Sequence, residues 1–375
     1  MANTLTAIAP TLYSAAKEVA AEPFGMVDAI NTDFDDKAVA KGDKVSVPVA
    51  PTRSASDFTP SNVSSTGADA TATKVEVEIT KSRKVDWNLT GEQIRSLENG
   101  GINQDWVRQL VAQGMRTLRN EAEDDAWLVA KNGASRAVGT AGTTPFASDL
   151  GALVDARKVL RDNGAPMADL QFVGDTAAEA NLLKLGLIQN AYQAGDDEQL
   201  RSGNLKRHFG FQLRASQGVD LHTKGTGASY LINDATPTAG KTTIAADTGT
   251  GTILAGDVVT FAGTSHKYVV NSALSGGSFS IGSPGLVTAE TDNDAITVGN
   301  SYTGNLAFER SAIVGVMRPP LIPSNPTIRQ MLVSDQFGMT YLMLEIDQYG
   351  QRSWELHLAW GFKVVNGEFI ATVMG

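Results

Sequence analysis

Residues 103–133 read NQDWVRQLVAQGMRTLRNEAEDDAWLVAKNG and carry the clearest helical pattern in the sequence. Apolar side chains recur there every three or four positions, as on a helix with one buried face: Val107, Leu110, Val111, Met115, Leu118, Ala122, Ala126 and Val129. The charged side chains lie mainly off this stripe: Arg116, Arg119, Glu121, Glu123 and Asp124. Asn103 suits the start of the helix and Gly133 its end. At about 1.5 Å per residue the helix spans about 43 Å, so we expect a long strut.

The composition excludes several classes of protein. With 375 residues, 42% of them hydrophobic and 19% charged, the chain can form two or three ordinary globular lobes. No run approaches the roughly 18 apolar residues that span a bilayer, and the first residues give no secretory signal. Because cysteine is absent, disulfides and thiolate metal sites are excluded. The net charge of -10 has the wrong sign for neutralising many phosphates, so sequence-specific nucleic-acid binding is not expected.

The part before the strut suggests an arm and a projecting hairpin. Residues 1–40 are acidic, and a short helix is predicted at about 10–21, ended by Pro23. Strands are predicted at 44–49 and 74–80, around a polar stretch rich in Ser, Thr, Ala, Pro and Gly. Such a long loop needs a function or a partner, although a disordered excursion is the alternative.

The part after the strut divides into a mixed lobe and a β-rich insert. One helix is predicted at 148–164, with Ser148 as its N-cap and its end at Asn163-Gly164. A second helix is predicted at 175–186, with Asp175 as its N-cap. Residues 226–303 lose helical periodicity and instead contain short β-rich runs, which predict an inserted barrel or sandwich. The C-terminal residues predict a long hairpin, turned at 347–350, and a last strand.

Motifs for catalysis are weak. Residues 235–242, ATPTAGKT, fit a relaxed phosphate-binding loop, but the residues after Lys241 are β-branched and then broken by glycine, where that loop needs a helix. A hairpin turn at 238–240 is favoured instead. The sequence contains no Gly-x-Ser-x-Gly motif. Its four histidines do not have the spacing of a zinc site: His208, His222, His266 and His357. We therefore expect no catalytic residue, metal or cofactor, and a protein that is not an enzyme.

Several stretches in order resemble the major coat proteins of tailed bacteriophages. The strongest is YTGNLAFERSAIVGVMRPP at 302–320, supported by GDVVTFAG, HKYVV and SPGLVTAE in the insert, by GNLKRHFGFQLRASQGV at 203–219 and by AWGFKVVNGEFIATVM at 359–374. The resemblance implies an α+β fold of the Hong Kong 97 type, in the P-twenty-two-type coat group, with an inserted small β-barrel domain.

The resemblance also implies a division of the chain. It assigns an N-terminal arm (1–40), an extended loop (41–85) and a peripheral domain with the spine helix (86–147). An axial domain (148–225) follows, then the inserted β domain (226–303). The chain ends with the return of the axial domain (304–335) and the last peripheral strands (336–375).

The implied function is self-assembly into hexamers and pentamers of an icosahedral phage head. A procapsid forms around a scaffolding protein, with a portal protein, and later encloses double-stranded DNA without sequence-specific binding. The expected location is the virion, after assembly in the host bacterial cytoplasm, without a membrane. An encapsulin-like nanocompartment shell of the same fold is the alternative, and residues 235–242 alone motivate a third hypothesis, a nucleotide-driven enzyme.

Contacts between subunits are expected at charged residues in and beside the projecting hairpin. The basic side comprises Arg53, Lys74, Lys81, Arg83 and Lys84. The acidic side lies on the arm of a neighbouring copy: Asp33, Asp35 and Asp36. The alternative is that these charges are simply solvated.

Overall fold

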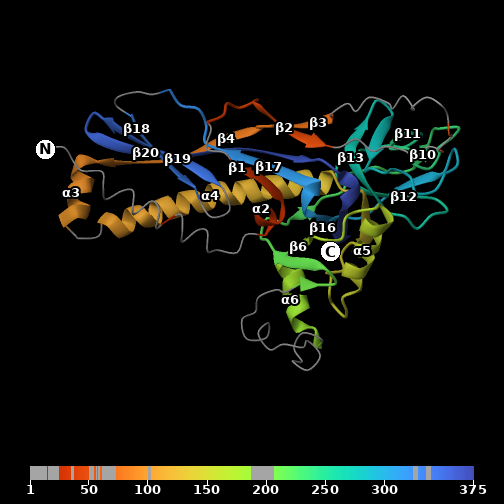
Figure 1. Cartoon of the computed structure of the whole chain (residues 1–375). Helices are drawn as coiled ribbons and strands as arrows, with labels where there is room; N and C mark the ends of the chain where they lie inside the picture. The colour runs from red at the N-terminus through yellow and green to blue at the C-terminus, as the bar shows by residue number, and fades with distance from the viewer. Residues whose placement is uncertain are drawn as a thin grey trace.

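The computed structural model describes residues 15, 25–34, 38–49, 55, 57, 60, 73–99, 103–186, 207–323, 328–334 and 339–375. Within these residues the fold is mixed α+β and rich in strands (Figure 1). Its helices and 3₁₀ turns are α2 (Met26–Ala29), α3 (Gly91–Asn99), α4 (Asn103–Asn132), α5 (Gly151–Asp162), α6 (Thr176–Lys184), η2 (Arg310–Ala312) and η3 (Gly367–Phe369).

The predicted strut is confirmed as α4, which ends directly before Gly133. Its apolar stripe packs on a six-stranded sheet, along which the helix runs (Figure 1). The sheet has the order β1 (Asn31–Phe34), β17 (Ile313–Arg318), β20 (Gln351–Val364), β19 (Thr340–Gln348) and β18 (Ile328–Ser334), and β4 (Lys81–Thr90) also pairs with β20. β19 and β20 form the long hairpin that the C-terminal sequence predicts.

A second set of strands forms the mixed lobe. The order is β5 (Arg136–Gly139), β21 (Ile370–Met374), β16 (Tyr302–Glu309), β6 (Leu170–Gly174), β8 (Phe211–Ala215) and β7 (Arg207–His208), and β9 (Leu221–His222) pairs with β16. Helices α5 and α6 contribute Leu153, Leu160 and Leu182 to one buried cluster with Phe172 and Phe211 of the strands. The last strand, β21, therefore lies in a different sheet from the hairpin that precedes it.

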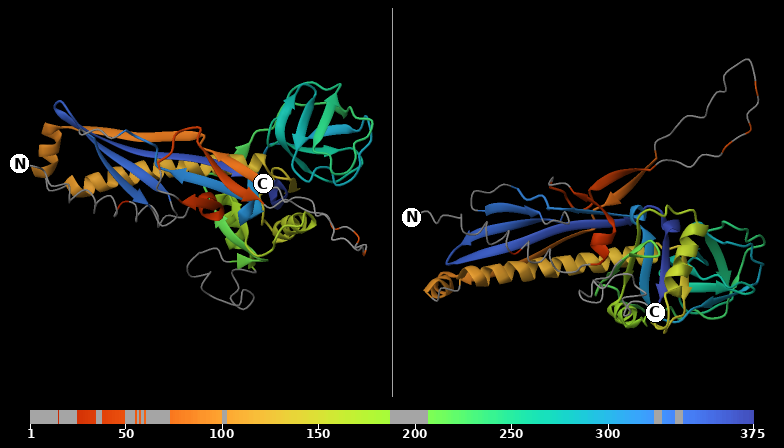
Figure 2. Two further views of the ribbon diagram at one scale, coloured as in Figure 1. Left: turned by 45° about the horizontal axis from the view of Figure 1, so that its top comes forward. Right: turned by 60° about the horizontal axis from the view of Figure 1, so that its bottom comes forward.

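Six strands between β9 and β16 close on themselves. They pair in the cycle β12 (Val258–Phe261), β15 (Ala295–Val298), β10 (Tyr230–Ile232), β11 (Thr243–Asp247), β14 (Ser278–Ile281) and β13 (Tyr268–Ser275), and β13 pairs again with β12. Their inward side chains form a separate core that includes Ile244, Val259, Tyr268 and Phe279. The predicted β-rich runs are thus strands of a six-stranded barrel, seen beside the body in Figure 2.

The predicted hairpin strands are also present, as β2 (Lys44–Val49) and β3 (Thr73–Glu78), which pair antiparallel. Val77 and Ile79 at the base of the pair pack on Val314, Val316 and Ala359. These residues lie on the face of the six-stranded sheet that is opposite α4, because neighbouring side chains of a strand point to opposite faces. The described part of the pair leads away from the body (Figure 2).

Of the two predicted helix caps in the mixed lobe, one is confirmed and one is wrong. The Asp175 cap of α6 is confirmed, since its side chain accepts a hydrogen bond from the Ala178 N–H at 2.8 Å. The Ser148 cap is wrong, because α5 begins only at Gly151. There the Asp149 carboxylate accepts a hydrogen bond from the Gly151 N–H at 2.7 Å, and this local bond competes with helix formation at 148–150.

Candidate functional site

Two of the basic residues predicted for subunit contacts lie where β4 crosses α4. Lys81 Nζ is 2.9 Å from Asp125 Oδ1, and Arg83 Nε is 2.9 Å from Glu121 Oε1. The hydrogen bond to Asp125 raises the pKa of Lys81. Both cations are partly exposed, so each pair contributes only about 0–1 kcal/mol to folding. The structure therefore gives both cations carboxylate partners within their own chain.

The other two described basic residues of the predicted contact, Lys84 and Lys74, are also paired within the chain. Lys84 Nζ lies 2.8 Å from Glu355 Oε1 across the β4–β20 pair, and Lys74 Nζ lies 2.9 Å from Glu76 Oε1 on the same strand. Lys74, together with Lys44, holds the pKa of Glu76 below its usual value. The sequence does not reveal Glu355 as the partner of Lys84, because cross-strand neighbours depend on the pairing register.

The acidic side of the predicted contact is largely outside the described residues. Asp35 and Asp36 fall outside them, as does Arg53 of the basic side. Asp33 lies in β1, opposite Val316 of β17. The predicted contact between the basic and acidic groups therefore stays a prediction.

The sequence pattern missed a buried carboxylate on α4. Glu123, predicted to lie off the buried stripe, is only 2% exposed. Its two oxygens accept hydrogen bonds from the N–H groups of Met26 at 2.7 Å and Val27 at 2.9 Å, and one of them also accepts from the Ser216 hydroxyl at 3.1 Å. Burial raises the pKa of this carboxyl group. Glu123 therefore caps the first turn of α2 from another helix and anchors the N-terminal segment.

A buried ion pair strengthens the same anchor. Arg119, also predicted to lie off the stripe, is fully buried, and its Nη2 donates a hydrogen bond to Asp28 Oδ1 at 2.9 Å. Arg214 of β8 approaches the second oxygen of Asp28 at 4.0 Å. The stripe prediction failed here because α4 is covered on two sides, by the sheet and by α2.

A buried chain of three side chains joins the barrel to α4. Lys131 Nζ lies 2.9 Å from His222 Nδ1, and His222 Nε2 lies 2.9 Å from Asp257 Oδ1. The Asp257 carboxylate also accepts hydrogen bonds from the N–H groups of Gly225 and Leu254. A neutral imidazole with its proton on Nε2 satisfies all these bonds, since it accepts from Lys131 and donates to Asp257.

The charge state of Lys131 makes this junction dependent on pH. Burial lowers the pKa of Lys131 to about 8, although Asp257 and Asp220 act against the shift. Between about 8 and the ordinary value of 10.5, the unfolded chain binds this proton and the folded chain does not. We expect the free energy of unfolding to rise with pH across that window, by at most about 1.4 kcal/mol per pH unit from this group.

Urea unfolding of wild type and Lys131→Met between pH 7 and 10.5 measures this contribution. The variant should lack the rise, whereas Lys158→Met, which changes an exposed lysine of α5, should keep it. Equal slopes for wild type and Lys131→Met would contradict the assignment.

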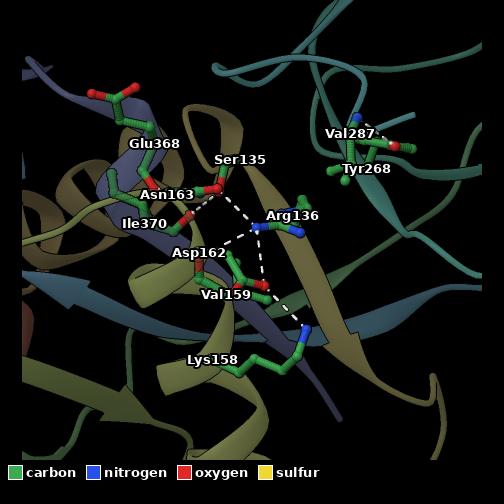
Figure 3. Close-up of polar contacts among 10 residues, drawn as sticks. All are labelled: Ser135, Arg136, Lys158, Val159, Asp162, Asn163, Tyr268, Val287, Glu368 and Ile370. Atoms are coloured by element: carbon green, nitrogen blue, oxygen red, sulfur yellow. Dashed lines mark hydrogen bonds and ion pairs between the residues drawn. The ribbon is translucent and has the colours of Figure 1, made fainter. Parts of the chain in front are cut away.

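The barrel meets the mixed lobe at Arg136 of β5. It pairs in register with Tyr268 where β5 meets β13. Its Nη2 donates hydrogen bonds to Asn163 Oδ1 at 2.8 Å and to the Val159 carbonyl at 3.3 Å, while Asn163 donates to the Glu368 carbonyl at 2.7 Å (Figure 3). The barrel is thus attached to both α4 and the strands of the mixed lobe.

The phosphate-loop candidate is a hairpin connection of the barrel. Gly240 has φ of +85°, Lys241 N–H donates to the Thr238 carbonyl at 3.2 Å, and strand β11 begins at Thr243. The Lys241 ammonium pairs with Asp234 and lowers the pKa of that carboxyl group. The prediction of a turn followed by a strand is confirmed, and its lysine is held by a carboxylate of the same loop.

The described residues contain neither a metal site nor a membrane-spanning helix. Among these residues no group of three or more histidine, aspartate or glutamate side chains is arranged to hold a metal ion. In the same part of the chain, no helix combines the length and apolar character needed to cross a membrane.

Comparisons with known proteins give structural likeness alone. The sequence matches no protein-family model and no curated protein. A solved structure from Mycobacterium phage Che8 is similar at 14% identity, covering 89% of this chain and 85% of that chain, with a TM-score of 0.47. The capsid structure of cyanophage P-SCSP1u is similar at 10% identity, covering 92% and 86%, with a TM-score of 0.47. A virus-like particle from Pyrococcus furiosus is similar at 9% identity, covering 97% and 98%, with a TM-score of 0.45. At these values the likeness assigns neither a family nor a function to this chain.

Proposed function

We propose that this chain is a coat subunit that assembles with copies of itself into a closed shell. The observation that carries the proposal is the β2–β3 pair, whose strands, in the described residues, pair only with each other. The base of this ribbon packs on the body, but a two-stranded ribbon that extends beyond such packing is at best marginally stable in water. A neighbouring copy that covers the ribbon supplies the missing contacts, and many such modest contacts stabilise a closed shell.

The sequence resemblance supplies the finer proposal, a tailed-phage major capsid protein of the P-twenty-two-type group. In this proposal α4 is the spine helix, β2 and β3 form the base of the extended loop, and the barrel is the inserted domain. Hexamers and pentamers build an icosahedral procapsid in the host bacterial cytoplasm, with scaffolding and portal proteins. The mature virion then encloses double-stranded DNA, which the net charge of -10 keeps from sticking to the wall.

The charged contact between subunits is part of the proposal. Lys81, Arg83 and Lys84 each have a carboxylate partner within the chain. An acidic arm from a neighbouring copy therefore joins an existing network of charges and does not meet a free cation. Such an exposed network adds specificity and little affinity, because each exposed pair is worth about 0–1 kcal/mol.

Electron microscopy of the full chain, produced in bacteria with the scaffolding protein encoded beside it, tests the proposal. We expect closed particles of uniform size. A control variant with Asn-Gly in place of residues 50–72 keeps β2 and β3 joined by a tight turn. It should fold but not close particles. Folded wild-type chains that remain small soluble oligomers would exclude a shell function.

The contents of the particles separate the phage head from the alternative, an encapsulin-like compartment of the same fold. Packaged DNA and a neighbouring portal gene support the head, whereas a packaged enzyme supports the compartment. The proposal also holds that the chain is not an enzyme, and ATP hydrolysis that depends on Lys241 would contradict it.

A further inference from the structure

The tight turn between β7 and β8 has an unusual residue. It consists of two residues, Phe209 with φ of +48° and Gly210 with φ of +89°. A two-residue hairpin turn with both φ angles positive normally carries Asn-Gly. Glycine adopts this conformation freely, but a bulky side chain such as phenylalanine does so at a conformational cost.

The Phe209 side chain does not offset this cost by burial. It is 49% exposed, and it belongs to none of the buried clusters of the described residues. The fold itself needs only a residue that tolerates the left-handed conformation, which asparagine does better. A strained residue that does not serve the fold is a reason to look for a function at that position.

The backbone of the turn is held firmly. Arg157 of α5 donates a hydrogen bond to the Phe209 carbonyl. Arg207 Nε donates to the Gly210 carbonyl at 2.8 Å, and its Nη2 donates to the Ala168 carbonyl at 2.6 Å. Because β7 is the last strand of its sheet among the described residues, the turn lies at a border of the described part of the mixed lobe. An aromatic side chain on such a support loses little entropy when it is bound.

We propose that Phe209 is an anchor in the contact between neighbouring copies of this chain. This inference rests on the proposed self-assembly. Exposed aromatic side chains on rigid supports are typical of the few residues that dominate an interface. The guanidinium groups of Arg157 and Arg207 bond the carbonyls of Phe209 and Gly210, so the turn carries positive charge and fits an acidic surface, and the chain itself carries a net charge of -10.

The opposite end of the same strands offers an acidic surface for this contact. β6 and β8 run parallel, with Leu170 beside Phe211 at the end near the turn. At the other end, β6 leads into α6, which begins with Asp175 as its cap and Glu179 in its first turn. A ring of subunits joins two different surfaces of each copy, so the turn of one copy meets the acidic end of the next.

The test compares Phe209→Asn with Phe209→Leu in the full chain. Phe209→Asn removes the aromatic ring and suits the turn, whereas Phe209→Leu keeps an apolar side chain in the same turn. We expect Phe209→Asn to leave the Tm of unassembled subunits unchanged or higher, and to raise the critical concentration for particle formation about tenfold or more. Phe209→Leu should assemble at close to the wild-type concentration. Val287→Asn, which changes a residue of the barrel that is 40% exposed, should have no effect.

Each contrary result has a distinct meaning. Particles from Phe209→Asn at the wild-type concentration would overturn the anchor and leave the shell function intact. A lower Tm would overturn it by showing that Phe209 serves the fold. An equal defect in Val287→Asn would show that the effect is not specific to Phe209. Wild-type chains that form no particles would remove the proposed function and this inference with it.

Discussion

Replacing Glu123 with alanine is expected to lower the free energy of unfolding by about 3 kcal/mol, because it leaves two buried N–H groups without an acceptor. These are the N–H groups of Met26 and Val27 at the start of α2, where a helix offers no partner of its own. Urea unfolding measures the loss, and amide exchange should show that Met26 and Val27 lose protection first.

Two further variants make this prediction specific. Gln113→Ala changes an exposed residue of the same helix and should alter the free energy of unfolding by less than about 0.5 kcal/mol. Glu123→Gln keeps one acceptor oxygen and removes the charge. Because burial raises the pKa of Glu123, the folded chain holds this proton to a higher pH than the unfolded chain does. Its contribution to stability therefore falls as the pH rises above 4.5, and Glu123→Gln should remove this fall. A pH profile of Glu123→Gln identical to that of wild type would contradict the raised pKa of Glu123.

Replacing Gly361 with alanine is expected to lower the free energy of unfolding by about 3 kcal/mol, through overlap with a neighbouring backbone. A Cβ atom at this position of β20 would overlap the Glu78 carbonyl oxygen and lie 3.1 Å from the Ile79 Cα atom. The base of the β2–β3 pair would have to move, which breaks the bond from the Thr80 N–H to the Trp360 carbonyl.

A matched glycine provides the control for this prediction. A Cβ atom added at Gly91 meets nothing within 4 Å, so Gly91→Ala should be neutral or slightly stabilising. Thermal and urea unfolding of both variants give the comparison. Equal stability of Gly361→Ala and Gly91→Ala would contradict the close contact of Glu78 and Ile79 with Gly361 of β20.

Local sequence patterns predicted those elements whose formation depends on neighbouring residues. The period of apolar residues identified α4 almost to its ends, because a long helix repeats the same pattern over many turns. The β-branched runs and glycine turns identified the barrel strands, including the turn at Gly240. The Asp175 cap followed from a bond that spans three residues.

Features that depend on distant pairing were beyond such patterns. The apolar stripe assumes that a helix is buried on one side, so it assigned Arg119 and Glu123 to the surface, although α2 covers them. The partners of Lys81 and Lys84 depend on the register between β4, α4 and β20, which no local signal encodes. The Ser148 cap failed because Asp149, one residue on, bonds the backbone first.

The closed barrel has a consequence for the order of folding. All six of its strands come from residues 230–298, whereas Asn31 of β1 pairs with Val314 and Lys81 of β4 pairs with Trp360 near the other end of the chain. Contacts between distant residues form slowly, because a long loop must close first. During synthesis the barrel can fold as soon as its own residues emerge, whereas the six-stranded sheet must wait for its C-terminal strands. The barrel, which lies in the middle of the sequence, is therefore the part that can fold before the two ends of the chain meet.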